Sequence, residues 1–280
     1  MSIVDVKEIV ERRKIKLKRE IVDLRDRGVI PKLAVILAND VEASRIYVSN
    51  KRKLCVDLGI EEVEYLFDEK VKGKDILEII DKLNNDSDVD GILVQLPLFK
   101  HLDETKIIDA ILPEKDVDGF SAINVGRLYE GRESVIPCTP KGILTILKEI
   151  EPELAGKNAV IVGRSQIVGK PMASLLLNEN MTVTICHSKT TNLPEHTREA
   201  DILVVATGVP HLIKEDMVKE GAIVIDVGLN RLNNKLVGDV DTENVGKKAK
   251  YITPVPGGVG LTTVLSLAEN IVELSKRKLK

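Results

Sequence analysis

Apolar residues recur at two spacings along the chain, and the two spacings alternate. Short apolar runs at 33–39, 62–67 and 90–98 predict β-strands, and stretches with helical spacing at 42–58 and 74–83 separate them. Strands that alternate with helices indicate βαβ units around a mainly parallel sheet. The run 90–98 is almost wholly apolar, so we expect this strand to be buried on both faces.

The alternation starts again after residue 157, with tighter loops. Five apolar runs predict strands there, and they lie at 158–163, 182–187, 201–207, 222–228 and 251–255. A helix joins the two halves, and Thr139 fits its N-cap because Pro140 would then take the first helical position. We expect a last helix after a glycine-rich loop, with Thr262 as its N-cap.

The composition fits a globular protein and narrows the choice of partners. It is 43% hydrophobic and 30% charged, and 41 Lys and Arg against 44 Asp and Glu leave a net charge of −3. This balance, with 2% aromatic residues and no Trp, does not favour nucleic acid or a membrane surface as a partner. Because charge is interleaved throughout the N-terminal stretch and no long apolar run follows, we expect a cytoplasmic protein.

Cysteine and histidine are scattered along the chain. The cysteines lie at 55, 138 and 186 without a CxxC pair, and the four histidines do not cluster. We therefore expect neither a disulfide framework nor a metal site.

The segment VIVGRSQIVGKPMASLLL predicts a strand, a glycine turn and a helix, which is the arrangement that binds a dinucleotide pyrophosphate. Gly163 fits the first glycine of GxGxxG, Ser165 replaces the second, and Gly169 arrives one residue late. A plain packing turn explains this loop equally well. The later strand ends Thr207-Gly208 and Asp226-Val227-Gly228 would lie at the same carboxyl edge, where such a sheet holds its ligand.

The end of the next strand bears on the choice of cofactor. An NAD enzyme would place a carboxylate there for the ribose 2′-hydroxyl, whereas this chain has His187, Ser188 and Lys189. Arg164 could reach the same place. Donors and positive charge favour a 2′-phosphate and therefore NADP, although a simple polar turn would have the same residues.

Three polar residues of the first half are candidates for chemistry. On the helix 42–58, Lys51 shares a stripe with Tyr47 and with apolar residues, so it either extends to solvent or lies in a cleft, where loss of water would equip it for proton transfer. Gln95 ends the buried strand, where it either binds a ligand or bonds a loop. In PEKDVDGF, Asp118 precedes a glycine, and its carboxylate could hold an amino-amide group or belong to an ordinary turn.

The glycine-rich loop PVPGGVG precedes the last helix. Its glycines, Gly257 and Gly258 among them, suit a backbone that borders a ligand, and a domain hinge explains them too.

Together these motifs resemble the methylenetetrahydrofolate dehydrogenase/cyclohydrolase family. The resemblance runs through YVSNKRK, GILVQLPL, PEKDVDGF, PCTPKG, VIVGRSQIVGKP, HSKT, ATG, IDVGLN, GDVD and PVPGGVG in the family's order, and covers most of the chain. It implies two α/β domains, the second a Rossmann-like parallel sheet, with the active-site cleft between them. The folate-binding catalytic domain would comprise 1–138 with the C-terminal helix 262–280, and the NADP-binding domain 139–261.

The resemblance also implies roles for single residues. Lys51 would be the general acid/base, Gln95 would orient it, and Asp118 would bind the amino-pyrimidine edge of the folate. The substrate would also contact Tyr47, Gly257 and Gly258. The cofactor-binding residues would be Gly163, Arg164, Ser165, Ser188, Thr207 and Gly208.

The implied reaction is oxidation of 5,10-methylenetetrahydrofolate by NADP, followed by hydrolysis to 10-formyltetrahydrofolate, in a homodimer. A dehydrogenase without the hydrolase activity, or a non-catalytic NADP sensor, stays open as an alternative. A short-chain dehydrogenase also uses Tyr-xxx-Lys, but there the pair follows the dinucleotide loop, whereas Tyr47 and Lys51 precede it. In the family, PGGVG is usually followed by Pro-Met-Thr, whereas this chain has Leu261-Thr262-Thr263 at that place. This difference leaves open the shape of the folate cleft.

Overall fold

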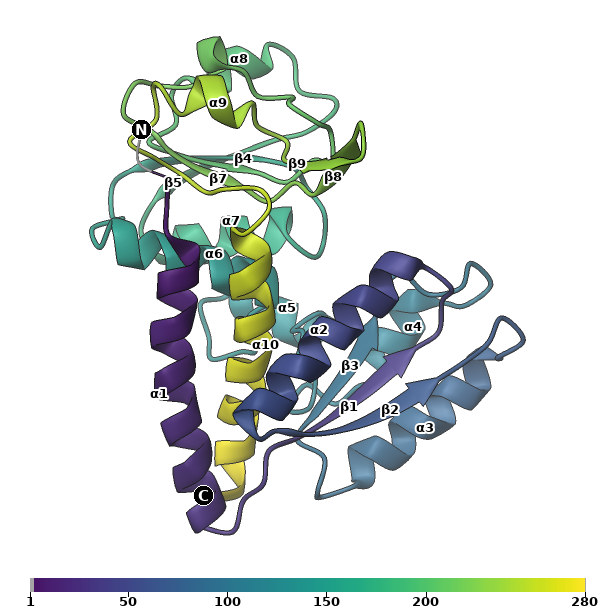
Figure 1. Ribbon diagram of the computed structural model, residues 1–280. Coiled ribbons are helices and arrows are strands. Elements are labelled where there is room, and N and C mark those ends of the chain that lie inside the picture. Colours follow the sequence, from purple (N-terminus) through teal and green to yellow (C-terminus); the bar gives the residue numbers. More distant parts are fainter. Residues whose placement is uncertain (1–2, 280) are drawn as a thin grey trace. The chain divides into compact units, whose positions relative to one another are not determined.

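The computed structural model describes residues 3–279, which form two compact units with separate parallel sheets (Figure 1). The three-stranded unit comprises 12–127, 133–138 and 264–280. The five-stranded unit comprises the chain up to Glu11 together with 128–132 and 139–263. The prediction of two α/β domains with parallel sheets is therefore confirmed.

In the three-stranded unit the strand order is β2-β1-β3, and both pairings are parallel. The strands are β1 (Lys32–Leu37), β2 (Glu61–Leu66) and β3 (Gly91–Gln95). The helices are α2 (Glu42–Leu58), α3 (Gly73–Asn85), α4 (Glu104–Asp109), most of α5 (Ala122–Tyr129) and the larger parts of α1 (Val6–Asp26) and α10 (Val259–Ser275). Alternate residues of β1 and β3, such as Ile36 and Val94, pack with α3 and α4 in one core.

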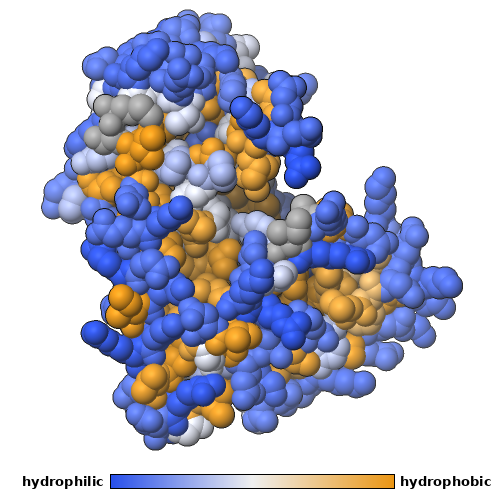
Figure 2. All heavy atoms as spheres, in the orientation of Figure 1, coloured by the Kyte–Doolittle hydropathy of each residue, from blue (hydrophilic) through white to orange (hydrophobic). Residues whose placement is uncertain are grey.

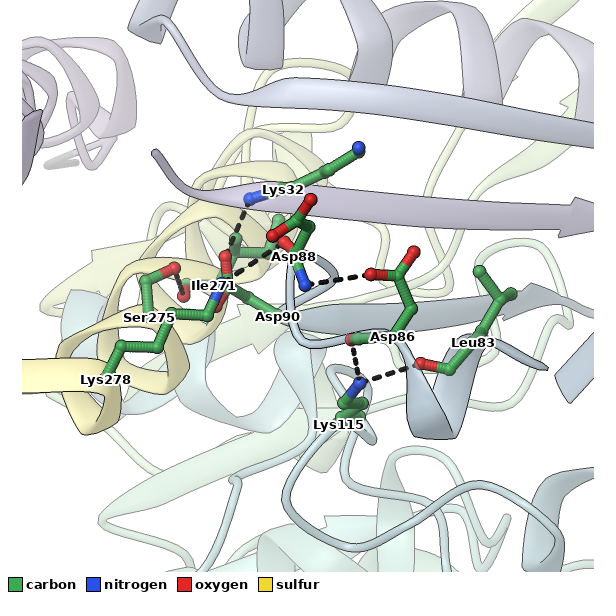
Figure 3. A network of polar contacts seen from close by, with 9 residues as sticks. All are labelled: Lys32, Leu83, Asp86, Asp88, Asp90, Lys115, Ile271, Ser275 and Lys278. Atoms are coloured by element: carbon green, nitrogen blue, oxygen red, sulfur yellow. Dashed lines mark hydrogen bonds and ion pairs between the residues drawn. The ribbon is translucent and has the colours of Figure 1, made fainter. Parts of the chain in front are cut away.

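Buried and half-buried charges fasten the amino edge of this sheet (Figure 3). The Asp90 carboxylate accepts the Lys32 backbone N–H at 2.9 Å and pairs with Lys278 at 2.7 Å, which ties the C-terminal 3₁₀ turn η2 (Lys276–Leu279) to the sheet. The Lys115 ammonium donates to the carbonyls of Leu83 and Asp86, at 2.7 and 2.6 Å, where α3 ends. A cation at this position satisfies carbonyls that the helix leaves without partners.

In the five-stranded unit the order is β10-β7-β6-β4-β5, and every pairing is parallel. Its strands are β4 (Asn158–Val162), β5 (Thr182–Cys186), β6 (Ile202–Val205), β7 (Ile223–Asp226) and β10 (Tyr251–Ile252). Its helices are α6 (Cys138–Ile150, from its second residue on), α7 (Gly169–Asn178), α8 (Leu193–Thr197), α9 (Thr242–Val245) and the 3₁₀ turn η1 (Glu215–Met217). On the face shown in Figure 2, hydrophilic side chains cover most of the part of this unit that is drawn at the top.

Two expected helix caps are wrong. Helix α6 begins at Cys138, so Thr139 is already helical, and its hydroxyl accepts a hydrogen bond from Thr263 at 3.2 Å. Helix α10 begins at Val259 within the glycine-rich loop, and the Thr262 hydroxyl donates to the Val259 carbonyl at 3.0 Å. The Thr139 hydroxyl therefore contacts the first turns of α10, and the Thr262 hydroxyl bonds to a carbonyl of its own helix.

Short elements were not apparent from the sequence pattern. The hairpin of β8 (Asn230–Leu232) and β9 (Lys235–Val237) turns at Asn233-Asn234, and both asparagines have positive φ. Asparagine tolerates this backbone region better than most residues, so the Asn-Asn pair was a usable signal. Among residues 3–279, no helix is both long and apolar enough to span a bilayer.

Glu62 on β2 is half-buried, and both of its carboxylate oxygens are shielded from solvent without a hydrogen-bond partner among the described residues. Burial, and then the neighbouring Glu64 carboxylate, raise the pKa of Glu62 to about 7. The folded protein therefore holds a proton that the unfolded chain releases at lower pH, so the free energy of unfolding falls as pH rises from the ordinary carboxyl range toward 7.

We expect Glu62→Gln to remove this pH dependence. Near pH 8 the variant should exceed the natural protein in unfolding free energy by on the order of 1 kcal/mol, after allowance for solvent screening, and near pH 5 the two should be equal. Urea unfolding at both pH values measures this difference, and Glu61→Gln, at the exposed neighbouring position, is the control. The same pH dependence in Glu62→Gln and the natural protein would contradict the prediction.

Candidate active site

The Lys51 side chain lies inside the three-stranded unit. It is 7% exposed, and its Nζ donates to Gln95 Oε1 at 3.1 Å and lies 5.5 Å from the centre of the Tyr47 ring. Extension of the ammonium into bulk solvent, which was one alternative, is therefore wrong. Tyr47 and Lys51 are one helical turn apart on α2, so both face the same place.

Gln95 is held at the carboxyl end of β3 by its neighbours. Its Nε2 donates to the Leu96 carbonyl at 2.9 Å, which leaves Oε1 directed at Lys51. Buried Asn39, just beyond β1, donates to the carbonyls of Pro97 at 2.7 Å and Gln95 at 3.4 Å. The ends of two adjacent parallel strands thus fix the acceptor of the lysine.

Asp118 faces the same cluster from the loop after β3. Burial raises the pKa of its carboxyl group, while the Lys51 ammonium and the Cys138 thiol act in the opposite direction. Burial raises the pKa of the Tyr47 phenol as well, and Cys138 and Asp118 add to this effect. Tyr47, Lys51, Gln95 and Asp118 therefore form one cluster, which we call the lysine site.

Asp116, two residues earlier, has a structural role. Its buried carboxylate accepts the backbone N–H groups of Ser121 at 2.8 Å and Phe120 at 3.3 Å, and the Asn124 amide at 3.0 Å. The turn between Asp118 and Ser121 depends on Gly119, which has φ +67°, and whose Cβ would collide with the Val135 carbonyl. Asp116 thus shapes the loop that presents Asp118.

Two residues that the sequence did not single out support this loop. The Cys138 thiol donates to Asp118 Oδ1 at 3.3 Å. Asn270 on α10 is 1% exposed, and its Nδ2 donates to the carbonyls of Val117 and Ile136, each at 2.9 Å. Cys138 lies in the PCTPKG motif, which gave it no role, and Asn270 carries no local signal because its partners are far away in sequence.

The glycine turn of the five-stranded unit is tightly packed. Gly163 has φ +136°, and a Cβ on it would strike the Ala206 carbonyl, while a Cβ on Gly169 would strike the Gly163 carbonyl. The Ser165 hydroxyl accepts the N–H groups of Val168 at 3.1 Å and Gly169 at 3.4 Å, at the start of α7. A bare backbone leading into a helix N-terminus fits a pyrophosphate.

The side chains expected at a 2′-phosphate lie at the ends of neighbouring strands. Arg164 follows β4 and Ser188 follows β5, and both are exposed. The turn after β5 is held by His187, whose N–H donates to Thr190 Oγ1 at 2.8 Å, while His187 Nδ1 accepts the Lys189 N–H at 3.1 Å. An exposed cation and a hydroxyl beside a fixed turn suit an anionic group.

The remaining expected residues also belong to the five-stranded unit. Thr207 and Gly208 form the turn after β6, and Asp239 accepts hydrogen bonds from both. Gly257 has φ +96°, and Gly258 has no room for a Cβ because the Pro254 carbonyl is too close. Within residues 3–279, no three histidine, cysteine or acidic side chains are grouped so that they could hold a metal ion.

A parallel sheet with a dinucleotide-type glycine turn, in the same chain as a buried lysine site, defines the class of two-domain α/β dehydrogenases. The family model "Tetrahydrofolate dehydrogenase/cyclohydrolase, catalytic domain" matches residues 4–118, and the NAD(P)-binding domain of the same family matches residues 137–279. The chain belongs to the tetrahydrofolate dehydrogenase/cyclohydrolase family.

Similar proteins agree over the full length. A "Bifunctional protein FolD" of Campylobacter hominis is 53% identical and covers 100% of this chain and 99% of its own, and one of Bacillus licheniformis is 51% identical with 100% and 99% covered. The crystal structure of the bifunctional FolD from Campylobacter jejuni has a TM-score of 0.97 at 48% identity, with 99% of each chain covered. The Trypanosoma brucei enzyme, complexed with NADP and inhibitor, has a TM-score of 0.95 at 35% identity, with 99% and 98% covered.

We expect Asn270→Ala to loosen the loop that carries Asp118. Two buried carbonyls would lose their donor, which costs about 2 kcal/mol in unfolding free energy. Denaturant unfolding measures the loss, and Asn85→Ala at an exposed position of α3 is the control. An unfolding free energy equal to that of the natural protein would show that these two hydrogen bonds do not hold the loop.

Proposed function

We propose that this protein oxidises 5,10-methylenetetrahydrofolate to the 5,10-methenyl compound with NADP and then hydrolyses that product to 10-formyltetrahydrofolate. The observation that carries the proposal is the buried ammonium of Lys51, fixed by the Gln95 amide and close enough to Asp118 to influence the pKa of its carboxyl group. The family and the bifunctional relatives support both activities.

The dehydrogenase step mainly requires that the folate and the cofactor be aligned. NADP, when bound, accepts the hydride that leaves the methylene carbon, and the folate nitrogens stabilise the resulting cation. In our proposal Tyr47 packs against the folate, and the Asp118 carboxylate accepts hydrogen bonds from the amino-pyrimidine edge. Gly257 and Gly258 would border the substrate with backbone alone.

The hydrolase step asks for a proton acceptor. Water adds to the methenyl carbon, Lys51 in its neutral form takes a proton from that water, and the ring C–N bond then breaks to give the formyl group. The proton on Lys51 then passes to the ring nitrogen that leaves, and the remaining O–H proton goes to solvent as the formyl C=O forms, so hydrolysis of the methenyl cation releases one proton overall. Gln95 keeps Nζ in place through both transfers because its own amide is anchored to Leu96.

NADP is the cofactor that the polar residues favour. Arg164 and Ser188 supply a cation and a hydroxyl donor at adjacent strand ends, and Gly163 and Ser165 shape the pyrophosphate turn. The Trypanosoma brucei relative, crystallised with NADP, supports this choice. A monofunctional dehydrogenase or a non-catalytic sensor is separated from the proposal by assaying both reactions with each nicotinamide cofactor.

We also propose the domain assignment: a folate-binding domain of 1–138 with 262–280, and a cofactor domain of 139–261. The division into compact units supports it for 12–127, 133–138 and 264–280, whereas 1–11 and 128–132 group with the five-stranded unit. The NAD(P)-binding family model extends to residue 279, so the family boundary differs at the last helix. The cytoplasmic location and the homodimer stay predictions.

We expect Lys51→Met to abolish ring opening while NADP still binds. Without the amine no group takes the proton from water, so hydrolysis of methenyltetrahydrofolate should fall at least about a hundredfold. Loss of the methenyl absorbance measures hydrolysis, and cofactor titration measures binding. Lys53→Met, exposed on the same helix, is the control, and hydrolysis at the normal rate in Lys51→Met would refute the role.

Arg164→Ala should weaken the binding of NADP far more than that of NAD. Removal of a charge-assisted contact to the 2′-phosphate should raise the KM for NADP about tenfold or more and leave the KM for NAD nearly unchanged. Initial rates with the two cofactors measure both constants. Arg231→Ala, exposed on β8, is the control, and equal losses with both cofactors would remove the argument for a 2′-phosphate site.

A further inference from the structure

We infer that Asp239 is a positioning residue for the cofactor, because it fixes the turn of Thr207 and Gly208 at the end of β6. This inference deepens the proposed function and rests on it, since the turn matters only if a nicotinamide dinucleotide binds there. Asp239 lies outside every regular strand and helix and is fully buried.

The turn lies where a doubly wound sheet reverses its strand order. The chain runs from β4 to the edge strand β5 and then back to β6, so β4 lies between β5 and β6. The glycine turn after β4 and the turn after β6 touch, because Gly163 faces the Ala206 carbonyl with no room for a Cβ. Ligands of such sheets bind outside the carboxyl ends of the strands at this point.

Asp239 accepts three hydrogen bonds from the turn. Its Oδ2 accepts the Thr207 N–H at 2.6 Å, the Thr207 hydroxyl at 2.9 Å and the Gly208 N–H at 3.0 Å. Its Oδ1 accepts the Asn230 amide at 2.8 Å. The other side of the turn is open, since a Cβ on Gly208 would meet nothing within 4 Å. The carboxylate thus fixes one side of the turn and leaves the other side for a ligand.

A second buried carboxylate holds Asp239 itself. Asp226, at the end of β7, accepts the N–H groups of Asp239 and Gly228, each at 2.9 Å, and that of Val240 at 3.0 Å. Gly228 and Gly238 pack so closely on the two carboxylates that neither has room for a Cβ. Asp226 therefore fixes the backbone of Asp239, and the Asn230 amide orients its carboxylate toward the turn.

The partners of Asp239 require an acceptor on both oxygens. An asparagine has the same shape, but its NH₂ group would face either the Asn230 amide or the donors of the turn. Asp239→Asn therefore removes at least one hydrogen bond and places donor against donor. The expected result is a displaced turn in a domain that keeps its core.

The experiment compares Asp239→Asn with the natural protein in three assays. The KM for NADP in the dehydrogenase assay should rise about tenfold or more. Hydrolysis of methenyltetrahydrofolate, which consumes no cofactor, should stay within about twofold. Binding of 2′,5′-ADP should be unchanged, because Arg164 and Ser188 lie toward β5 while the turn follows β6. Asp216→Asn, at an exposed position of the same unit, is the control.

The outcomes distinguish a failure of the role of Asp239 from a failure of the proposed function. An unchanged KM for NADP in Asp239→Asn would overturn the inference, and so would a loss of 2′,5′-ADP binding and hydrolysis to the same degree. If Asp239→Asn does not fold, Asn230→Ala decides, because it removes only the donor to Oδ1 and should raise the KM for NADP severalfold with hydrolysis retained. Absence of both activities in the natural protein would instead refute the proposed function.

Discussion

The chemistry proposed for this protein depends on keeping one ammonium group out of water. A buried charge is costly unless a partner compensates it, and the amide oxygen of Gln95 compensates Lys51 without neutralising it. The Gln95 amide carries no charge of its own, so this contact fixes the position of Nζ without forming an ion pair. The strand ends around Gln95 hold the amide oxygen in place through the Leu96 carbonyl and Asn39.

In each unit a buried polar side chain fixes the backbone just beyond the carboxyl end of a parallel strand. Asn39 donates to the Pro97 carbonyl after β3 in one unit, and Asp239 accepts the Thr207 N–H after β6 in the other. Because the carboxyl ends of parallel strands lie at one edge of the sheet, a single side chain can reach the end of a neighbouring strand. Fully satisfied buried polar groups confer a single geometry, whereas partly satisfied ones would destabilise the fold.

The sequence was sufficient for the main strands and most of the larger helices because their apolar periods are regular. It placed Lys51 on a helix and Gln95 at the end of a buried strand, and only the family resemblance implied that the two side chains meet. It was insufficient where contacts between distant residues decide. The hydroxyls of Thr139 and Thr262 look like caps locally, but the helices begin one and three residues earlier than those threonines. Asn270 and Asp239 act through partners that no short motif contains.

Leu261 and Thr262, where the chain departs from the family pattern, lie within helix α10. Because α10 already begins at Val259, these residues do not form the loop that Gly257 and Gly258 shape. Thr262 is buried and packs on Gly142 of α6 so closely that a Cβ on the glycine would collide with it. The replacement therefore lies in the first turn of α10, where Thr262 packs against α6, and outside the loop of the two glycines.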